Sequence, residues 1–164
     1  MLTQKYESPC GDLLLGVRGN HLVLCDWMIG NRIERTLRRI EKYLPKAGKD
    51  NPELLDTAIR QLSEYFSGVR KEFDLPLRTF GTEFQKDIWE SLKEVAYGKT
   101  ASYKTIAEAT GQNRGARAVA NAIGANAISI IIPCHRIVGS DGSLKGYAGG
   151  RKAKKYLLDL EKMK

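Results

Sequence analysis

The stretch Ile130-Ile131-Ile132-Pro133-Cys134-His135-Arg136-Ile137-Val138 decides how the second half of this 164-residue chain is interpreted. An apolar run ends at Pro133, and a cysteine, a histidine and an arginine follow it directly. The apolar run is typical of a buried strand. The thiolate is the nucleophilic form of cysteine, and a nearby histidine or arginine lowers the pKa of the thiol or accepts its proton. The stretch therefore predicts a buried strand that ends at a nucleophilic cysteine.

His135 and Cys134 are adjacent, and adjacent side chains of a strand point to opposite faces. His135 can therefore act on the thiol only if the chain turns after Pro133 or a water molecule bridges the two groups. An imidazole that acts as a base also needs a third group to orient it. Asp159 and Glu161, in a predicted C-terminal helix, are both candidates. The plainer interpretation, that Cys134 is only a small buried hydrophobic residue, stays open on this pattern alone.

Upstream of this stretch, the sequence predicts a short helix near residues 105–110, a turn at Gly111 and a second helix near 115–125. Two short helices joined by a glycine turn form either a helix-turn-helix or an ordinary helical hairpin. The second helix carries Arg117 among small residues, whereas a helix that reads the major groove carries long polar side chains. On DNA, such a helix makes contacts governed by shape and backbone, with Arg117 inserted into the base stack. Packing against the rest of the protein is the alternative.

The chain is long enough for one ordinary domain or two small ones. Hydrophobic residues make up 42% and charged residues 28%, the balance of a globular protein. We expect an α+β fold with a structural N-terminal α/β domain over residues 1–75 that holds a short antiparallel sheet. A linker over 76–81 and a mainly helical C-terminal domain over 82–164, which contains the helix-turn-helix, complete the expected fold.

Within the first domain, short strands alternate with glycine turns over residues 4–28, and Gly19-Asn20 is typical of a tight hairpin turn. Apolar residues at helical spacing predict a helix over 32–44. A second helix begins at Asn51, which can cap it, and ends at Gly68. Thr82 caps the first helix of the C-terminal domain, which we expect to run to about Val95.

The positive charge of the chain is concentrated in one segment. Lysine and arginine number 27 against 19 acidic residues, a net charge of +8, yet residues 1–98 carry fifteen of each sign. Residues 99–155 carry ten basic and two acidic side chains, so the whole excess lies there. A solvated basic surface would explain such an excess, but its concentration favours a polyanionic partner.

Several classes of protein are disfavoured by the same sequence. No stretch approaches the roughly 20 apolar residues that cross a bilayer, and the first residues lack the apolar core of a signal peptide. Three cysteines are an odd number and argue against a disulfide framework. We therefore expect an intracellular protein with reduced thiols.

Pro133-Cys134-His135-Arg136-Ile137, preceded by Asn126 and followed by Gly146-Tyr147-Ala148-Gly149-Gly150, resembles the signature of a known family. That family is the O6-alkylguanine-DNA alkyltransferases, or methylated-DNA–protein-cysteine S-methyltransferases. The resemblance covers nearly the whole chain and is strongest from Gly81 to Glu161. It includes further matches at Gly81-Thr-Glu-Phe-Gln85, Tyr97-Gly-Lys-Thr-Ala-Ser-Tyr103, Arg117-Ala-Val119 and Leu157-Leu158.

The resemblance implies direct-reversal repair of DNA. An alkyl group would pass irreversibly from O6 of guanine to Cys134, once per protein molecule, after minor-groove binding and nucleotide flipping; activity on O4 of thymine stays open. The implied partner is double-stranded DNA, with a monomeric protein in solution and cooperative binding on DNA left open. No cofactor, metal or membrane is implied. The implied compartment is the cytoplasm of a prokaryote or the nucleus of a eukaryote.

The resemblance also assigns roles to residues. Cys134 would accept the alkyl group, His135 would take its proton through a water molecule, and Glu161 would orient His135. Asn126 would brace the turn, and Arg117 would replace the flipped nucleotide. Tyr103 would assist the leaving base and turn its phosphate. The remaining implied contacts are DNA-backbone contacts by Tyr103, Lys104, Gln112 and Ser140, and a base pocket at Ile137, Tyr147, Ala148 and Gly149.

Two features of the sequence depart from relatives in the family. Position 148 is alanine where some relatives carry serine, so a role for a hydroxyl there is in question. Some relatives hold zinc in the N-terminal part. Here Cys10, His21 and Cys25 have irregular spacing and lack a fourth ligand of the same kind, so we expect ordinary strand residues.

Two other functions remain as alternatives. A Cys-His-Glu hydrolase or thiol transferase would use the same three side chains but would leave the basic segment unexplained. A DNA-binding regulator without catalysis would use the helix pair but would leave Cys134 and its neighbours unexplained.

Overall fold

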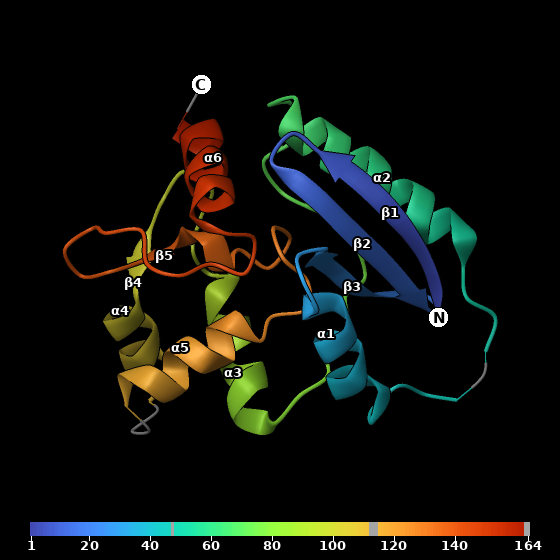
Figure 1. The fold of residues 1–164 in the computed structure, drawn as a ribbon, viewed down its shortest axis with the longest axis horizontal. Coiled ribbons are helices and arrows are strands. Elements are labelled where there is room, and N and C mark those ends of the chain that lie inside the picture. Colours follow the sequence, from blue (N-terminus) through green and yellow to red (C-terminus); the bar gives the residue numbers. More distant parts are fainter. Residues whose placement is uncertain (47, 112–114, 163–164) are drawn as a thin grey trace.

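The N-terminal part of the computed structural model is a three-stranded antiparallel sheet. The structure describes residues 1–46, 48–111 and 115–162. Strands β1 (Leu2–Ser8), β2 (Gly11–Arg18) and β3 (His21–Trp27) follow one another in the order β1-β2-β3 (Figure 1). The predicted turn at Gly19-Asn20 joins β2 to β3, and Gly19 has a φ of 62°, which glycine adopts without strain.

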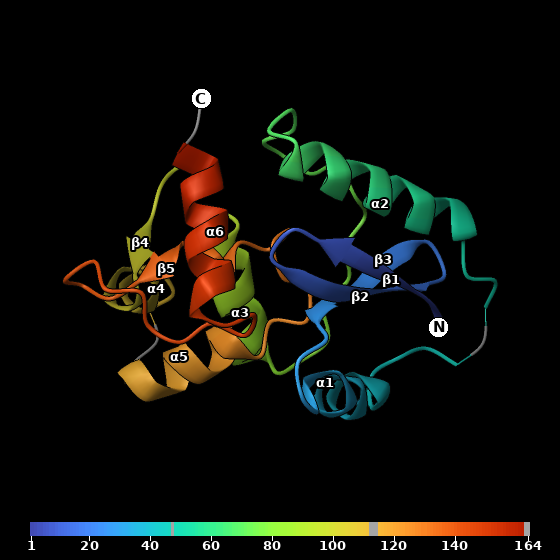
Figure 2. The ribbon, with the colours of Figure 1, turned by 45° about the horizontal axis from the view of Figure 1, so that its top comes forward.

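Two helices lie on opposite sides of this sheet (Figure 2). Helix α1 (Arg32–Glu41) ends three residues earlier than the apolar spacing predicts. Helix α2 (Pro52–Phe66) begins as predicted, because the Asn51 side chain accepts a hydrogen bond from the Glu53 amide at 3.0 Å. The predicted sheet and both helices are therefore confirmed.

The C-terminal part contains the predicted helix pair. Helix α3 (Glu83–Leu92) starts with a capping box in which Thr82 and Gln85 bond each other's backbone amides. Short strand β4 (Ala101–Ser102) leads into α4 (Tyr103–Ala109), and α5 (Ala116–Gly124) packs against both α3 and α4. The indole Nε1 of Trp89 in α3 donates to the carbonyl oxygen of Ala122 at 2.8 Å. This buried bond fixes α5 from behind.

The predicted strand over 130–132 is wrong. The chain forms turns from Ser129 to Ile131, and a single 3-10 turn, η1 (Cys134–Arg136), follows Pro133. Ile130 and Ile132 are buried and Ile131 is half-buried, but they pack into the interior from a turn. Strand β5 (Ile137–Val138) then pairs in parallel with β4, and α6 (Arg151–Lys162) closes the fold.

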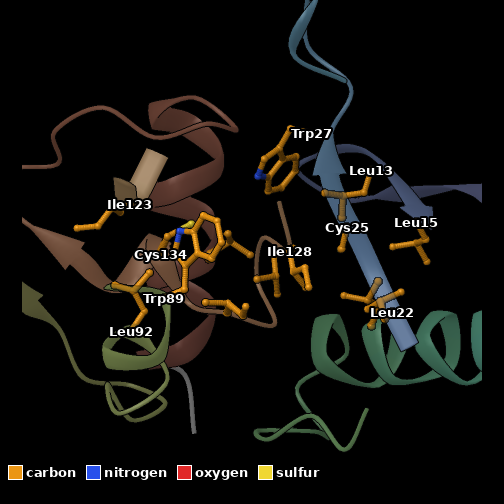
Figure 3. Close-up of a cluster of buried hydrophobic side chains, with 14 of the residues drawn as sticks. Leu13, Leu15, Leu22, Cys25, Trp27, Trp89, Leu92, Ile123, Ile128 and Cys134 are labelled. Atoms are coloured by element: carbon orange, nitrogen blue, oxygen red, sulfur yellow. The ribbon is translucent and has the colours of Figure 1, made fainter. Parts of the chain in front are cut away.

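One hydrophobic core joins the two parts of the molecule (Figure 3). Ile128 lies between the sheet side chains and the group that contains Trp89 and Cys134. The amide of Cys25 in β3 donates to the carbonyl of Ala127 at 2.8 Å, and the amide of Ser129 donates to the carbonyl of Cys25 at 2.7 Å. The expected α+β fold is confirmed, and the sheet directly contacts the turn that leads to Cys134.

The segment between the two parts runs along the sheet. The amide of Leu22 donates to the carbonyl of Pro76 at 2.8 Å, and the amide of Arg78 donates to the carbonyl of Leu22 at 3.1 Å. None of the described helices is both long and apolar enough to span a bilayer.

Candidate active site

The Asn126 side chain fastens the turn that carries Cys134. Its Nδ2 donates to the carbonyl oxygen of Ile132 at 2.9 Å and lies 3.3 Å from the Sγ of Cys134. Its Oδ1 accepts a hydrogen bond from the amide of Ile128 at 2.9 Å. Asn126 is only 1% exposed, so one buried amide group closes the turn at both ends and touches the thiol.

The same turn holds a strained residue. Ile130 has a φ of 72°, the left-handed region that β-branched residues rarely adopt. Such a conformation costs about 1–3 kcal/mol and persists only where the surroundings enforce it. Here the Asn126 bonds on one side and the Cys25–Ser129 bond on the other enforce it.

Cys134 lies in the first turn position after Pro133 and is 5% exposed. Burial raises the pKa of its thiol, and the Asn126 hydrogen bond and the positive charges of Arg32 and Lys154 partly oppose that rise. The expectation that Arg136 acts on the thiol is wrong, because its guanidinium binds Glu161. At neutral pH the thiol therefore needs a base.

His135 meets a carboxylate of α6. Its Nε2 lies 2.7 Å from Oε2 of Glu161, and both residues are buried. Burial lowers the pKa of His135 despite the attraction of Glu161, so the imidazole is neutral at neutral pH. The other candidate, Asp159, is exposed and pairs with Lys155 at 2.6 Å. Of the two alternatives that the sequence left open, a turn after Pro133 is present as η1, so His135 is not bound by the opposite-face geometry of a strand.

The carboxylate of Glu161 accepts hydrogen bonds from two further residues, Arg136 and Tyr65. Burial alone would raise its pKa, but hydrogen bonds from His135 and Arg136 outweigh burial and lower that pKa to about 2. Arg136 donates from Nε at 2.8 Å and from Nη2 at 3.1 Å. The hydroxyl of Tyr65, in α2, donates to Oε2 at 2.6 Å. Glu161 is therefore a fixed, ionised acceptor whose Oε2 faces the histidine.

One ring nitrogen of His135 remains available. Among the described residues, Nδ1 of His135 is buried and has no hydrogen-bond partner in the protein. If Nε2 carries the proton that Glu161 accepts, Nδ1 is the basic atom of the neutral ring. The ring therefore presents its acceptor nitrogen within the site and its donor nitrogen to the carboxylate.

Tyr103 and Lys154 also lie near Cys134, close enough for electrostatic interaction with the thiol. Tyr103 is half-buried at the start of α4, and the Nζ of Lys154 lies 6.0 Å from the centre of its ring. Burial and the nearby Cys134 raise the pKa of Tyr103, so its hydroxyl stays protonated. Lys154 is fully buried and donates to the carbonyls of Ile137 and Lys145. Ile137 is one of the predicted base-pocket positions, and the Lys154 bond uses one of the two lone pairs of its carbonyl oxygen.

Lys154, Tyr65 and Arg32 were not anticipated from the sequence. Lys154 precedes Glu161 by seven positions, which places both on one side of α6. That helical spacing is a signal that could have singled it out. Tyr65 and Arg32 come from the domain expected to be structural, and no motif marks either residue.

The loop at 146–150 packs against the sheet. The Nε1 of Trp27 donates to the hydroxyl of Tyr147 at 3.2 Å, and the Tyr147 ring centre lies 6.5 Å from that of His135. A Cβ on Gly149 would lie 2.5 Å from the Trp27 ring, so only glycine fits there. Ala148 is half-buried beside it. The loop therefore lies between the sheet and the histidine.

A cavity of about 940 Å³ lies over α4 and α5. Its walls include the predicted contact residues Tyr103, Lys104, Arg117 and Ser140, whereas the buried Cys134 is not among the residues that line it. The exposed side of α5 consists of Ala116, Arg117, Ala120, Asn121 and Gly124. Gln112, also predicted to contact DNA, lies outside the described residues.

The considered zinc ligands do not meet in space. His21 is exposed, Cys25 is fully buried in the core, and Cys10 is half-buried in the turn between β1 and β2. Across the described ranges, no three histidine, cysteine or acidic side chains cluster as metal ligands would.

Comparison with known proteins covers both parts of the chain. Residues 1–79 match the 6-O-methylguanine DNA methyltransferase, ribonuclease-like domain, and residues 83–163 match the 6-O-methylguanine DNA methyltransferase, DNA binding domain. A methylated-DNA–protein-cysteine methyltransferase of Methanosarcina barkeri is 45% identical over 155 residues, 94% of this chain and 93% of that protein. The constitutive methylated-DNA–protein-cysteine methyltransferase of Bacillus subtilis is 36% identical over 163 residues, 96% and 93% of the two chains. The crystal structure of Mycobacterium tuberculosis OGT in complex with DNA matches with a TM-score of 0.81 and 37% identity, covering 98% and 92%.

The fold and the site define a DNA-binding protein that carries a helix-turn-helix and a buried thiol beside a histidine–glutamate pair. The chain belongs to the 6-O-methylguanine DNA methyltransferase family. Its activity is direct-reversal repair of DNA, in which an alkyl group passes to a cysteine of the protein, and its enzyme class is methylated-DNA–protein-cysteine methyltransferase. The resemblance seen in the sequence is confirmed, and the hydrolase and the regulator are set aside.

Proposed function

We propose that Cys134 is the acceptor and that it takes an alkyl group from O6 of guanine in double-stranded DNA. The observation that carries this proposal is the buried chain of contacts from Asn126 and Cys134 through the turn to His135 and Glu161. Neither Cys10 nor Cys25, the other cysteines, hydrogen-bonds through its sulfur to Asn126, His135 or Glu161 among the described residues. Cys25 is fully buried in the core, and the sulfur of Cys10 lies 3.7 Å from the Ser8 hydroxyl. Of the three cysteines, Cys134 is the one that contacts Asn126 and adjoins the His135–Glu161 pair, which can accept the thiol proton.

The first step removes the thiol proton. Cys134 and His135 share no direct hydrogen bond, so the proton moves from Sγ to Nδ1 of His135 through one water molecule. Glu161 stabilises the imidazolium that forms, because its carboxylate already binds Nε2. Asn126 donates to the sulfur and stabilises its negative charge. The charges of Arg32 and Lys154 act in the same direction.

The second step is a nucleophilic displacement at the alkyl carbon. A C–S bond forms at Cys134 while the bond from carbon to O6 breaks, and the bonding electrons leave with the guanine. The leaving base takes up one proton, and Tyr103, whose hydroxyl stays protonated, is the donor we assign. The thioether product is stable, and we propose that each molecule reacts once.

The substrate base must leave the helix to reach Cys134, because O6 lies inside the base stack. We assign the exposed side of α5 to the minor groove, since its alanines and glycine allow a close approach of the backbone. Arg117 is the one long side chain on that side and fills the space of the flipped nucleotide. The loop at Tyr147, Ala148 and Gly149 and the backbone at Ile137 receive the flipped base.

Backbone contacts complete this arrangement. Tyr103, Lys104 and Ser140 line the cavity over α4 and α5 and are placed to meet phosphates, and we keep Gln112 as a further contact. Every member of the proposed proton relay comes from one chain. We therefore propose that the protein is a monomer in solution, with cooperative binding along DNA left to experiment.

Intact-protein mass spectrometry tests the proposal. The wild type and Cys134→Ser are incubated with a duplex that contains one O6-methylguanine. We expect the wild type alone to gain the mass of one methyl group and to stop at one equivalent. Cys25→Ser serves as the matched control, since that buried thiol is expected to leave the gain unchanged. A methyl group on Cys134→Ser would overturn the assignment of the acceptor.

A further inference from the structure

A second, smaller cavity lies where the N-terminal part meets the end of α5. It measures about 390 Å³ and lies between α1 and the C-terminal half of α5. Both views of the fold place α1 next to the chain that leaves α5 (Figures 1 and 2). The residues that line the cavity are Arg32, Arg35, Thr36 and Arg39 of α1, with Ala120, Asn121, Gly124 and Ala125 around the end of α5.

The three arginines of this cavity are not equivalent. Arg32 is occupied, because its Nε binds the buried Asp26 at 2.8 Å and its Nη2 donates to the carbonyls of Gly124 and Asn126. Arg39 donates through Nη2 to the carbonyl of Ala125, while its Nη1 has no partner among the described residues. Arg35 is exposed, and no side-chain hydrogen bond or ion pair engages its guanidinium within the described part of the chain.

This cavity continues the surface that we assign to DNA. Ala120 and Asn121 line both the large cavity over α4 and α5 and the smaller cavity beside α1. From Ala116 to Gly124 the exposed side of α5 spans about 12 Å at 1.5 Å per residue. That length corresponds to roughly three to four base pairs at 3.4 Å each. A duplex laid along α5 would therefore pass Arg117 first and then the arginines of α1.

We propose that Arg35 and Arg39 form a phosphate-binding site of the N-terminal part, which holds the backbone of duplex DNA a few base pairs from the flipped nucleotide. This inference rests on the proposed placement of α5 against DNA. It assigns a binding role to a domain that the sequence presents as structural, and it extends the DNA contact beyond the helix-turn-helix.

The chemistry of the cavity fits a phosphate. A guanidinium offers planar pairs of N–H donors that match phosphate oxygens, and the side chains of Arg35 and Arg39 both line this cavity. Nη1 of Arg39 is buried there and has no hydrogen-bond partner among the described residues. No described carboxylate pairs with either side chain. Burial, and to a lesser extent the positive charge of Arg32, lower the pKa of Arg39, while Asp26 partly opposes that change. Arg32 serves a different purpose, since its bonds join α1 to the end of α5.

The test compares two arginines of the same helix. Arg35→Ala removes a guanidinium from the cavity, whereas Arg38→Ala removes an exposed guanidinium of α1 that does not line it. Binding to a duplex is measured over a series of salt concentrations. We expect Arg35→Ala to weaken binding severalfold and to reduce the slope of log K against log salt by about one, as for one lost phosphate contact. Arg38→Ala is expected to match the wild type.

A second measurement locates the contacted phosphate. Single uncharged methylphosphonate linkages are placed one at a time along each strand of the duplex. We expect one or two adjacent positions on one side of the lesion to weaken binding of the wild type and of Arg38→Ala, with no further loss for Arg35→Ala. Equal behaviour of Arg35→Ala and Arg38→Ala in both measurements would overturn the site and leave the arginines free for an acidic protein partner.

Failure of this inference is distinguishable from failure of the proposed function. All three proteins are also tested for methyl transfer from the duplex at saturating concentration. If Cys134 reacts in the wild type while Arg35→Ala and Arg38→Ala bind DNA alike, only the α1 site is wrong. If the wild type neither binds the duplex nor reacts with it, the placement of α5 on DNA is wrong as well.

Discussion

The turn that carries Cys134 and the exposed side of α5 are built in opposite ways. In and against this turn, Asn126, His135 and Glu161 of α6 are buried, and each makes hydrogen bonds to other residues of the site. On the exposed side of α5, small side chains and Arg117 face outward. The helix is held by its packing on α3 and α4, by the bond from Trp89 to Ala122 and by the bond from Arg32 to the carbonyl of Gly124. The proposed proton relay is thus held in place by buried hydrogen bonds, whereas the surface that we propose for DNA is exposed.

This difference follows from what each region has to do. A proton relay needs side chains held close to their working geometry, because catalytic hydrogen bonds depend steeply on position. A surface that approaches the backbone and the minor groove needs access and shape more than internal bonds. Substitutions in the turn should therefore alter stability and all reactions, whereas substitutions on α5 should alter reactions on duplex DNA alone.

Glu161→Gln gives the largest expected effect. The glutamine places an N–H₂ group among the donors of His135, Arg136 and Tyr65 and leaves the buried charge of Arg136 unpaired. Breaking a buried pair in this way costs about 3–5 kcal/mol of stability. We expect urea unfolding at pH 7 to show that loss, and we expect the pH–rate profile of reaction with free O6-benzylguanine to shift toward higher pH because the pKa of Cys134 rises. An unchanged profile in folded protein would refute the relay.

The Glu161 carboxylate should also make the unfolding free energy depend on pH. The pKa of Glu161 falls from its ordinary 4.5 to about 2 in the folded protein. Its contribution is therefore complete above pH 4.5 and is lost as the pH falls toward 2, since protonation is harder in the folded state. At 1.36 kcal/mol per pKa unit the contribution amounts to about 3 kcal/mol. The difference in unfolding free energy between wild type and Glu161→Gln should shrink over this interval; a constant difference would contradict the pKa shift.

Arg117→Ala is the matching test on the open surface. Extrusion of a base costs a few kcal/mol, and the loss of the side chain that replaces it should slow repair of a saturating duplex about ten- to a hundredfold. The rate with free O6-benzylguanine and the unfolding free energy should stay unchanged. Lys104→Ala is the control from the same cavity, since it should lower affinity for the duplex but not the rate at saturation. Equal losses on both substrates would remove the flipping role of Arg117.

The sequence predicts well those features of the structure that depend on neighbouring residues. Caps at Asn51 and Thr82 and the glycine turn after β2 depend on neighbouring residues, and the structure contains all of them. The helix pair follows from the same kind of local spacing. The isoleucines at 130–132 misled the prediction, because an apolar run indicates burial but does not distinguish a strand from a buried turn.

The site residues differ in how far the sequence could predict them. Cys134 and His135 are adjacent in the sequence, whereas the residue pattern alone named Glu161 together with Asp159. The family resemblance singled out Glu161, and in the structure this carboxylate meets the histidine. The direction of Arg136 depends on the 3-10 turn, which residue spacing does not reveal. Tyr65 lies 96 positions from Glu161, so only the packing of α2 against the C-terminal part brings the two together.

Tyr65→Phe gives the smallest expected effect. It tests whether the N-terminal part supports the proposed proton relay of Cys134, His135 and Glu161. The phenylalanine keeps the buried ring and removes one hydrogen bond to a carboxylate that retains bonds from His135 and Arg136. A hydrogen bond to a charged group contributes about 1.5 kcal/mol at the low end, so the unfolding free energy should fall by that amount. Reaction with free O6-benzylguanine should slow severalfold, because Glu161 is held less firmly against the imidazole. Tyr6→Phe is the matched control, since it removes an exposed hydroxyl contact to Ser63 of the same helix and should change neither quantity. If Tyr65→Phe and Tyr6→Phe have the same unfolding free energy and the same reaction rate, the Tyr65 hydroxyl does not support Glu161. The N-terminal part would then contribute packing alone.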